Sequence, residues 1–180
     1  RMIYFEAITN PLVQVADLSA VVEFAREHDL VSVIDNTFAS PVNFRPAEIG
    51  FDLSLHSGPK FLNGHSDIVC GAVIGRTEPV AKVKKMMNYL GGSLDAHACF
   101  LLHRGLKTLG LRVRQQNESA LALAHALEAH HAVARVNYPG LPSNTGHETA
   151  SRLFEGFGGM LSFELAGGEN AARRLEEAVT

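Results

Sequence analysis

The sequence predicts an α/β protein with a parallel sheet, followed by the start of a second, smaller α/β domain. Short runs rich in β-branched, aromatic and other apolar residues, at 2–5, 31–34 and 52–56, alternate with amphipathic segments. A strand, a helix and a second strand follow one another before residue 35, which is typical of a βαβ unit with parallel strands. After residue 79 the pattern changes to long helices, and strand-like runs return near residue 132.

The first βαβ unit begins with a short buried strand over residues 2–5. Asp17 can cap a helix over residues 18–28, because apolar side chains recur there at i, i+3, i+4 and i+7. Residues 31–34 (Val-Ser-Val-Ile) predict the next strand. That strand leaves Asp35 at its carboxyl end.

The strand pattern then repeats. Residues 46–50 predict a short helical turn, and strands are expected over 52–56 and 68–74. Lys60 follows the end of the first of these strands. Because ligands of open α/β sheets bind beyond the carboxyl ends of the strands, we expect Asp35 and Lys60 to face one crevice.

The remainder of the chain predicts long helices and then a second α/β unit. We place the boundary between a large domain, residues 1–117, and an incomplete small domain, residues 118–180. The expected helices are 80–89, 94–109, 111–130 (divided from the preceding helix near Gly110), 147–154 and 169–179, and the expected strands are 132–137 and 160–165.

Composition excludes some functions. Of 180 residues, 46% are hydrophobic and 19% charged, which suits a folded core. A net charge of −3, with scattered lysines and arginines, gives no electrostatic basis for nucleic-acid binding. There is no membrane-length apolar run and no visible signal peptide, so we expect no membrane partner. Cys70 and Cys99 form no Cys-x-x-Cys pair, which favours a reduced cytoplasmic setting.

The segment around Lys60 is the first candidate site. Ser57 and Gly58 can wrap an anion, and Lys60 follows them at the end of a strand. A lysine in this setting is a candidate for a Schiff base with a carbonyl group, beside a phosphate site. The ordinary alternatives are a solvated surface charge for Lys60 and a turn or helix cap for Asp35.

Other chemistries have less support. Nine histidines are present, but no His-Glu-x-x-His motif occurs, so we expect no metal site. Residues 156–159 (Gly-Phe-Gly-Gly) lack the Lys-Ser/Thr pair of a phosphate-binding loop and precede a strand. A nucleotide-binding module is disfavoured because no Gly-x-Gly-x-x-Gly lies between a strand and a helix.

Six segments carry the most specific signal, and they occur in order along the whole chain. They are Thr-Asn-Pro at 9–11, Asp-Asn-Thr-Phe-Ala-Ser-Pro at 35–41, Ser-Gly-Pro-Lys-Phe-Leu-Asn-Gly-His at 57–65, Arg-Gly-Leu-Lys-Thr-Leu at 104–109, Asn-Tyr-Pro-Gly-Leu at 137–141 and Gly-Gly-Met-Leu-Ser-Phe at 158–163. Together they resemble the Cys/Met-metabolism enzymes that use pyridoxal 5'-phosphate (PLP), the trans-sulfuration family. That family includes cystathionine γ-lyase, γ-synthase and β-lyase, and methionine γ-lyase.

The resemblance implies fold type I of the PLP-dependent transferases, with a three-layer αβα large domain, and it gives roles to four residues. Lys60 would bind the cofactor aldehyde and then move protons at the substrate Cα. Asp35 would hold the pyridine nitrogen protonated, and Ser57 would bond the phosphate. Asn10 would lie near the ring oxygen, with an ordinary Asn-Pro turn as the alternative.

The implied function is trans-sulfuration: γ-elimination or γ-replacement on sulfur amino acids or activated homoserine, as in cystathionine γ-lyase or γ-synthase. Methionine γ-lyase and cystathionine β-lyase are alternatives, because pocket residues that set specificity lie partly outside this chain. A non-catalytic remnant that binds PLP weakly is an alternative of another class. The resemblance also implies an amino-acid substrate and a homotetramer.

Two departures from the family pattern concern cofactor binding. Relatives usually carry threonine where this chain has Pro59, which has neither a hydroxyl nor a backbone N–H. The chain also begins inside an expected strand, so we expect residues upstream of it. The family's phosphate loop and ring-stacking aromatic lie upstream, and its arginine for the substrate carboxylate lies downstream. None of these is assigned to a residue here.

Overall fold

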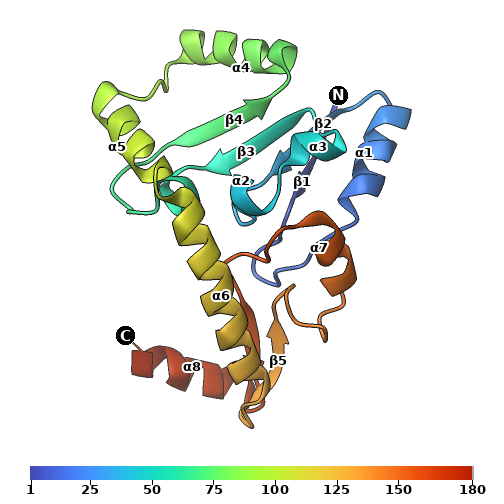
Figure 1. The fold of residues 1–180 in the computed structure, drawn as a ribbon, viewed down its shortest axis with the longest axis vertical. Coiled ribbons are helices and arrows are strands. Elements are labelled where there is room, and N and C mark those ends of the chain that lie inside the picture. Colours follow the sequence, from blue (N-terminus) through green and yellow to red (C-terminus); the bar gives the residue numbers. More distant parts are fainter. Residues whose placement is uncertain (180) are drawn as a thin grey trace.

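The computed structural model describes residues 1–179, which form two sheets (Figure 1). The first sheet has the order β1 (Met2–Glu6), β2 (Val31–Asp35), β3 (Leu53–Ser57) and β4 (Gly71–Gly75). Strands β1, β2 and β3 are parallel, as predicted, but β4 runs antiparallel to β3. The link between them contains one short helical turn and no crossover helix, so the chain returns beside β3 without crossing the sheet.

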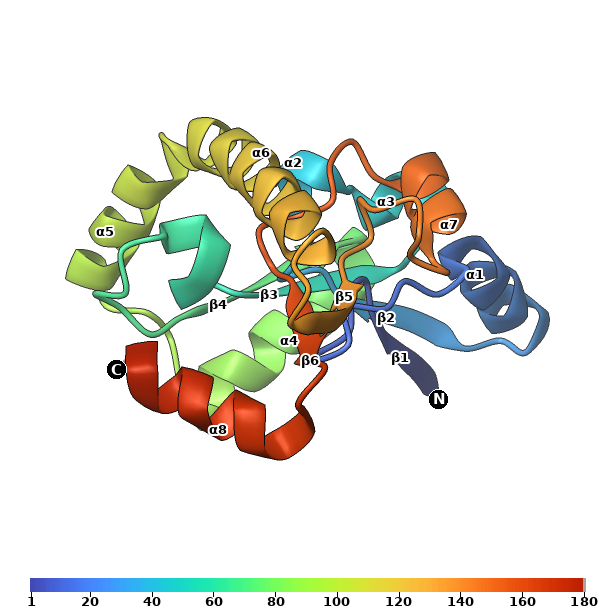
Figure 2. The same ribbon diagram turned by 90° about the horizontal axis from the view of Figure 1, so that it is seen from below.

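Helices lie on both sides of this sheet. Figure 2 shows α1, α6 and α7 on one side and α4 on the other. Within the described residues, no helix combines the length and apolar character that a membrane span needs. The helices are α1 (Leu18–Glu27), α2 (Ser40–Asn43), α3 (Pro46–Ile49), α4 (Thr77–Leu90), α5 (Ala96–Leu106), α6 (Leu109–Glu128), α7 (His147–Leu153) and α8 (Gly168–Val179), and an irregular turn, η1, spans Pro59–Asn63.

The expected division of the long helical region near Gly110 is displaced in the structure. The break lies at Lys107 and Thr108, and Gly110 is inside α6. Leu109 begins α6 buried against Leu62 of η1. A glycine inside a helix costs about 1 kcal/mol relative to alanine, and packing at Leu109 outweighs that preference. The short elements α2 and η1 are too brief for periodicity to reveal, and the sequence did not predict them.

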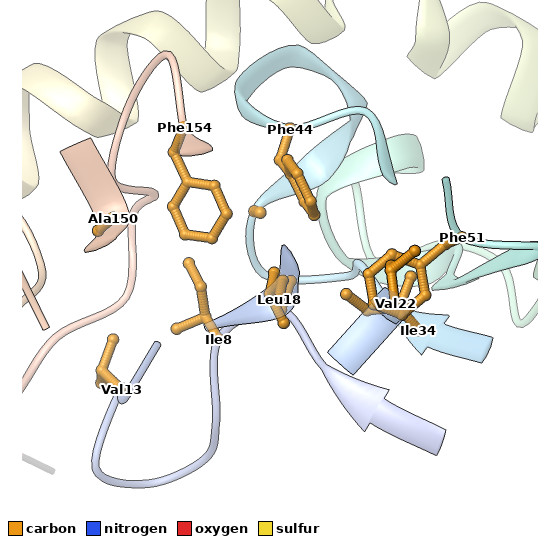
Figure 3. Close-up of a cluster of buried hydrophobic side chains, with 11 residues drawn as sticks. Ile8, Val13, Leu18, Val22, Ile34, Phe44, Phe51, Ala150 and Phe154 are labelled. Atoms are coloured by element: carbon orange, nitrogen blue, oxygen red, sulfur yellow. The ribbon is translucent and has the colours of Figure 1, made fainter. Parts of the chain in front are cut away.

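The main hydrophobic core lies between α1, one face of the sheet and α7 (Figure 3). Leu18 and Val22 of α1 are buried there with Ile34 of β2. Phe154, directly after α7, packs against Phe44 with ring centroids 5.0 Å apart and the ring planes tilted by 55°. Late residues of the chain therefore help to close the core of the first sheet.

The opposite face of the sheet is more exposed along its edge strand, β1. Along β1, Ile3 and Phe5 are half-buried, whereas Met2, Tyr4 and Glu6 are exposed. The register pairs Glu6 with Asp35, and side chains of paired residues project from the same face. Tyr4 and Asp35 therefore lie on the same face of the sheet.

The second sheet pairs β5 (Val133–Asn137) with β6 (Ser162–Leu165) in antiparallel fashion. Its core contains Tyr138 and Leu141 with Ala120 and Ala124 of α6. The Tyr138 hydroxyl donates to the backbone carbonyl of Gly158 at 2.9 Å, and burial raises the pKa of this phenol to about 12. The second core is thus built on the carboxyl-terminal half of α6.

A pair of asparagine side chains connects α2, which follows the second strand of the first sheet, to α6, which packs on the second sheet. Asn43 of α2 and Asn117 of α6 exchange two hydrogen bonds, of 3.0 and 2.8 Å. Asn117 Oδ1 also accepts from the backbone N–H of Gly158 at 3.0 Å. A Cβ at Gly156 would lie 2.2 Å from Asn117 Nδ2, so glycine is needed there. The domain boundary expected between residues 117 and 118 falls at this junction, inside α6, and stays a prediction.

Candidate active site

The four predicted site residues follow the carboxyl ends of the three parallel strands. Asn10 lies in the loop after β1, Asp35 ends β2, Ser57 ends β3, and Lys60 lies in η1 directly after β3. Neighbouring parallel strands end at the same edge of a sheet, and that edge is where open α/β sheets bind ligands.

Both carboxylate oxygens of Asp35 accept a hydrogen bond. The backbone N–H of Thr37 donates to Oδ1 at 2.9 Å, and the Tyr4 hydroxyl donates to Oδ2 at 3.2 Å. The residue is half-buried. An oriented, partly desolvated carboxylate is suited to pair with a protonated nitrogen in a ligand.

Thr37 links the end of β2 to the end of β3. Besides its backbone contact with Asp35, its Oγ1 accepts from the backbone N–H of Ser57 at 2.8 Å. Thr37 is 5% exposed. One buried residue therefore fixes two of the predicted site residues, Asp35 and Ser57, relative to each other. Thr37 was not predicted as a site residue. Its one signal in the sequence is its place two positions after Asp35, the spacing of an Asx turn.

Lys60 projects from η1 as an exposed side chain. Its Nζ lies 4.7 Å from the centroid of the Phe38 ring, a cation–π distance. The Phe38 ring meets Phe61 edge-on, with centroids 6.5 Å apart. Aromatic packing thus gives the lysine amine a defined place beside the segment that follows Asp35.

Arg112 of α6 holds the turn that carries Lys60. Its guanidinium donates to the backbone carbonyls of Phe61 at 2.9 Å, Leu62 at 3.3 Å and Gly105 at 2.9 Å, and its Nε donates to Thr108 Oγ1 at 3.0 Å. Burial lowers the pKa of Arg112, but an arginine stays charged at neutral pH. The helical pattern of α6 gave no signal for this role, because it depends on a contact between distant segments.

The start of the lysine turn is closely packed against the strand that follows it. The backbone N–H of Gly58 donates to the carbonyl of Cys70 at 3.0 Å, and a Cβ at Gly58 would lie 2.1 Å from Cys70 Sγ. Any larger residue at position 58 would therefore force the Cys70 side chain to move. The cysteine acts here as a packing partner for the turn.

Ser57 and Asn10 differ in how firmly they are placed. Ser57 is half-buried, and its backbone is fixed by Thr37. Asn10 is exposed in a tight loop that Thr9 closes through its Oγ1, which accepts from the backbone N–H of Gln14 at 3.0 Å. Within residues 1–179, no hydrogen bond connects Asn10 to the other three predicted residues, so their common location rests on the order of the strands.

His56 is a buried titratable group next to this edge that the sequence analysis missed. It is 4% exposed on β3, and its Nε2 lies 3.3 Å from Ser54 Oγ. Burial lowers the pKa of the imidazole, and the Asp35 carboxylate opposes that shift. The ring is therefore neutral at pH 7.

Among the described residues, no group of three or more His, Cys, Asp or Glu side chains could hold a metal ion.

These residues fit PLP by their chemistry. A carboxylate suits the pyridine nitrogen, an amine suits the aldehyde, and a hydroxyl suits the phosphate. Gly58 N–H is already bonded to Cys70, and Pro59 has no N–H, so this turn offers the phosphate few backbone donors. Fold and site together define an α/β protein with a strand-end acid and lysine of the kind that PLP-dependent proteins use.

Comparison with known proteins specifies the family. The model of the Cys/Met metabolism PLP-dependent enzymes matches residues 1–180, and the chain belongs to this family. It is 44% identical over 176 residues to a probable cystathionine gamma-synthase of Herpetosiphon aurantiacus, covering 97% of this chain and 55% of that protein. It is 42% identical over 179 residues to a cystathionine beta-lyase of Coxiella burnetii, covering 98% and 46%.

Solved structures agree. The cystathionine gamma synthase of Xanthomonas oryzae pv. oryzae, in complex with aminoacrylate and cysteine, has a TM-score of 0.91 and 43% identity, covering 96% of this chain and 45% of that one. The similarity confirms the predicted α/β fold. The chain spans about half the length of the curated relatives it matches.

Proposed function

We propose that this chain is part of a PLP-dependent trans-sulfuration enzyme, which acts on sulfur amino acids or activated homoserine by γ-elimination or γ-replacement. The observation that carries the proposal is the placement of Asp35 and Lys60 at adjacent strand ends, in a chain that is 42–44% identical to a cystathionine gamma-synthase and a cystathionine beta-lyase. The same proposal includes a homotetramer, which the family resemblance supports, and a cytoplasmic setting, which the two cysteines outside any Cys-x-x-Cys pair favour.

Each residue has a task in this proposal. PLP supplies an electron sink for negative charge that develops at the substrate Cα. Asp35 keeps the ring nitrogen protonated, and Ser57 donates its hydroxyl to the phosphate. The Lys60 amine binds the cofactor and afterwards takes and returns the proton at Cα. Asn10 is proposed to lie near the ring oxygen.

Two observations keep other functions in view. The identity to a cystathionine beta-lyase is nearly as high as that to a gamma-synthase, so β-elimination is the second candidate reaction. Pro59 has no backbone N–H to donate to the proposed phosphate position. Its presence favours the alternative of a non-catalytic protein that keeps the fold but binds PLP weakly.

One assay panel separates these functions. The full-length protein, with PLP, is incubated with cystathionine, methionine or an O-acylated homoserine plus cysteine, and the products are identified. We expect γ-elimination from cystathionine or γ-replacement on the homoserine ester. Pyruvate and homocysteine from cystathionine would indicate the β-lyase, and methanethiol from methionine would indicate methionine γ-lyase. A protein that neither turns yellow with PLP nor turns over any of these substrates would contradict the enzyme proposal.

Replacing Pro59 with threonine is expected to tighten PLP binding. Gly58 adopts helical angles before the proline (φ −64°, ψ −35°), which proline disfavours in the preceding residue, and threonine removes that conflict. Threonine also adds a hydroxyl and an N–H beside the proposed phosphate position. A hydrogen bond to a charged group corresponds to about tenfold to a hundredfold in the dissociation constant, measured by titrating the apo protein with PLP.

Pro59→Val is the matched control, because valine restores the N–H and has the shape of threonine without the hydroxyl. We expect Pro59→Val to tighten PLP binding less than Pro59→Thr. Either substitution can cost about 0.4–1 kcal/mol of stability by freeing the unfolded chain, and melting of the apo protein reports that effect separately. Unchanged or weaker PLP affinity in Pro59→Thr would show that the phosphate does not contact position 59.

A further inference from the structure

The contact between Tyr4 and Asp35 has no task in the chemistry described above. The two side chains lie on the same face of the sheet, on neighbouring strands β1 and β2. The Tyr4 hydroxyl donates to Asp35 Oδ2 at 3.2 Å, while the backbone N–H of Thr37 donates to Oδ1 at 2.9 Å. Each carboxylate oxygen is therefore held by a different donor.

We propose that Tyr4 is a positioning residue for Asp35, whose phenol fixes the orientation of the carboxylate that faces the ring nitrogen of PLP. The inference rests on the proposed function, because it assumes that Asp35 pairs with that nitrogen. Tyr4 itself touches neither the cofactor nor the substrate in this proposal. It acts only through Oδ2 of Asp35.

The physical need for such a residue comes from the aspartate side chain. Its terminal torsion is broad, so a carboxylate held at one oxygen can still rotate. Thr37 alone would leave Oδ2 free to turn, and the phenol removes that freedom. An ionised carboxylate has about four lone-pair positions, so two donors leave room for a third from the ligand. Tyr4 thus orients Asp35 without competing for the position that the ring nitrogen needs.

The charged surroundings support a contact with an ionised Asp35. Burial first, and then the Asp35 carboxylate and Glu6, raise the pKa of the Tyr4 phenol, so it remains a donor at neutral pH. The Asp35 carboxylate also acts on His56, whose pKa is lowered by burial, so this ring is neutral at pH 7. His56 therefore presents no positive charge that competes with the ligand for Asp35.

The test measures affinity for two cofactors that differ at one atom. Apo full-length protein, as wild type and as Tyr4→Phe, is titrated with PLP and with 1-deaza-PLP, in which a C–H replaces the ring nitrogen. We expect Tyr4→Phe to weaken PLP binding by about threefold to tenfold, because the contact between Asp35 and the ring nitrogen is misaligned and not lost, and to leave 1-deaza-PLP binding unchanged. Tyr89→Phe, which removes an exposed phenol from α4, should alter neither affinity.

Two controls make the outcome decisive. Asp35→Asn should also weaken the binding of PLP more than the binding of 1-deaza-PLP. Adding Tyr4→Phe to Asp35→Asn should cause no further loss of PLP affinity. If Tyr4→Phe weakened the binding of both cofactors equally, Tyr4 would have a merely structural role and the proposal would be overturned. Unchanged PLP affinity in Tyr4→Phe would also overturn it. If Asp35→Asn itself fails to distinguish the cofactors, the assignment of Asp35 fails, and with it this inference.

Discussion

Replacing Lys60 with alanine is expected to abolish covalent attachment of PLP and to lower turnover at least about a thousandfold. The amine would be both the group that binds the aldehyde and the base at the substrate Cα, so a single change removes both tasks. The side chain is exposed and its amine lies over the Phe38 ring, so the fold should be retained without it. The measurement is borohydride reduction of the PLP-loaded full-length protein, followed by peptide mapping, together with steady-state turnover.

Two further lysine variants make the result specific. Lys60→Arg keeps a cation over the Phe38 ring but cannot condense with an aldehyde at neutral pH, so it should be as inactive as Lys60→Ala. Lys107→Ala removes an exposed lysine at the end of α5 and should leave attachment and turnover unchanged. A borohydride-stable adduct on another lysine of Lys60→Ala, with activity retained, would mean that Lys60 is not the PLP lysine.

Replacing Asp35 with asparagine is expected to lower turnover by about a hundredfold or more, with a smaller effect on PLP affinity. A neutral amide cannot hold the pyridine nitrogen protonated, so the ring accepts electrons less well. Asparagine Oδ1 can still accept from the backbone N–H of Thr37, so the end of β2 should keep its conformation. Turnover and PLP dissociation constants of the full-length variant test both parts of the expectation.

Asp29→Asn is the matched control, because Asp29 is an exposed acid at the end of α1 and the change removes one charge far from the strand ends. It should leave turnover unchanged. The ultraviolet circular dichroism of both variants should match that of the wild type. Turnover of Asp35→Asn within a few-fold of the wild type would remove Asp35 from its proposed role.

The sequence alone was sufficient to predict the class of fold and to propose where the site lies. Hydrophobic periodicity identified β1, α1, β2 and β3, because burial of one face leaves a regular pattern along the chain. Because these strands are parallel and adjacent, their carboxyl ends lie at one edge of the sheet. Asp35 and Ser57 end two of the strands and Lys60 lies just beyond, so their location at that edge follows from their positions in the sequence. The family match agrees with the resemblance in six short segments.

Tertiary structure alone decided how these residues are held. Thr37 bonds to both strand ends, Arg112 reaches across from α6 to the lysine turn, and Tyr4 contacts Asp35 from a neighbouring strand. The reversed direction of β4 likewise depends on how the preceding link packs. Periodicity reports which face of a segment is buried, whereas these contacts join residues distant in sequence, and their geometry exists only after the segments have packed together.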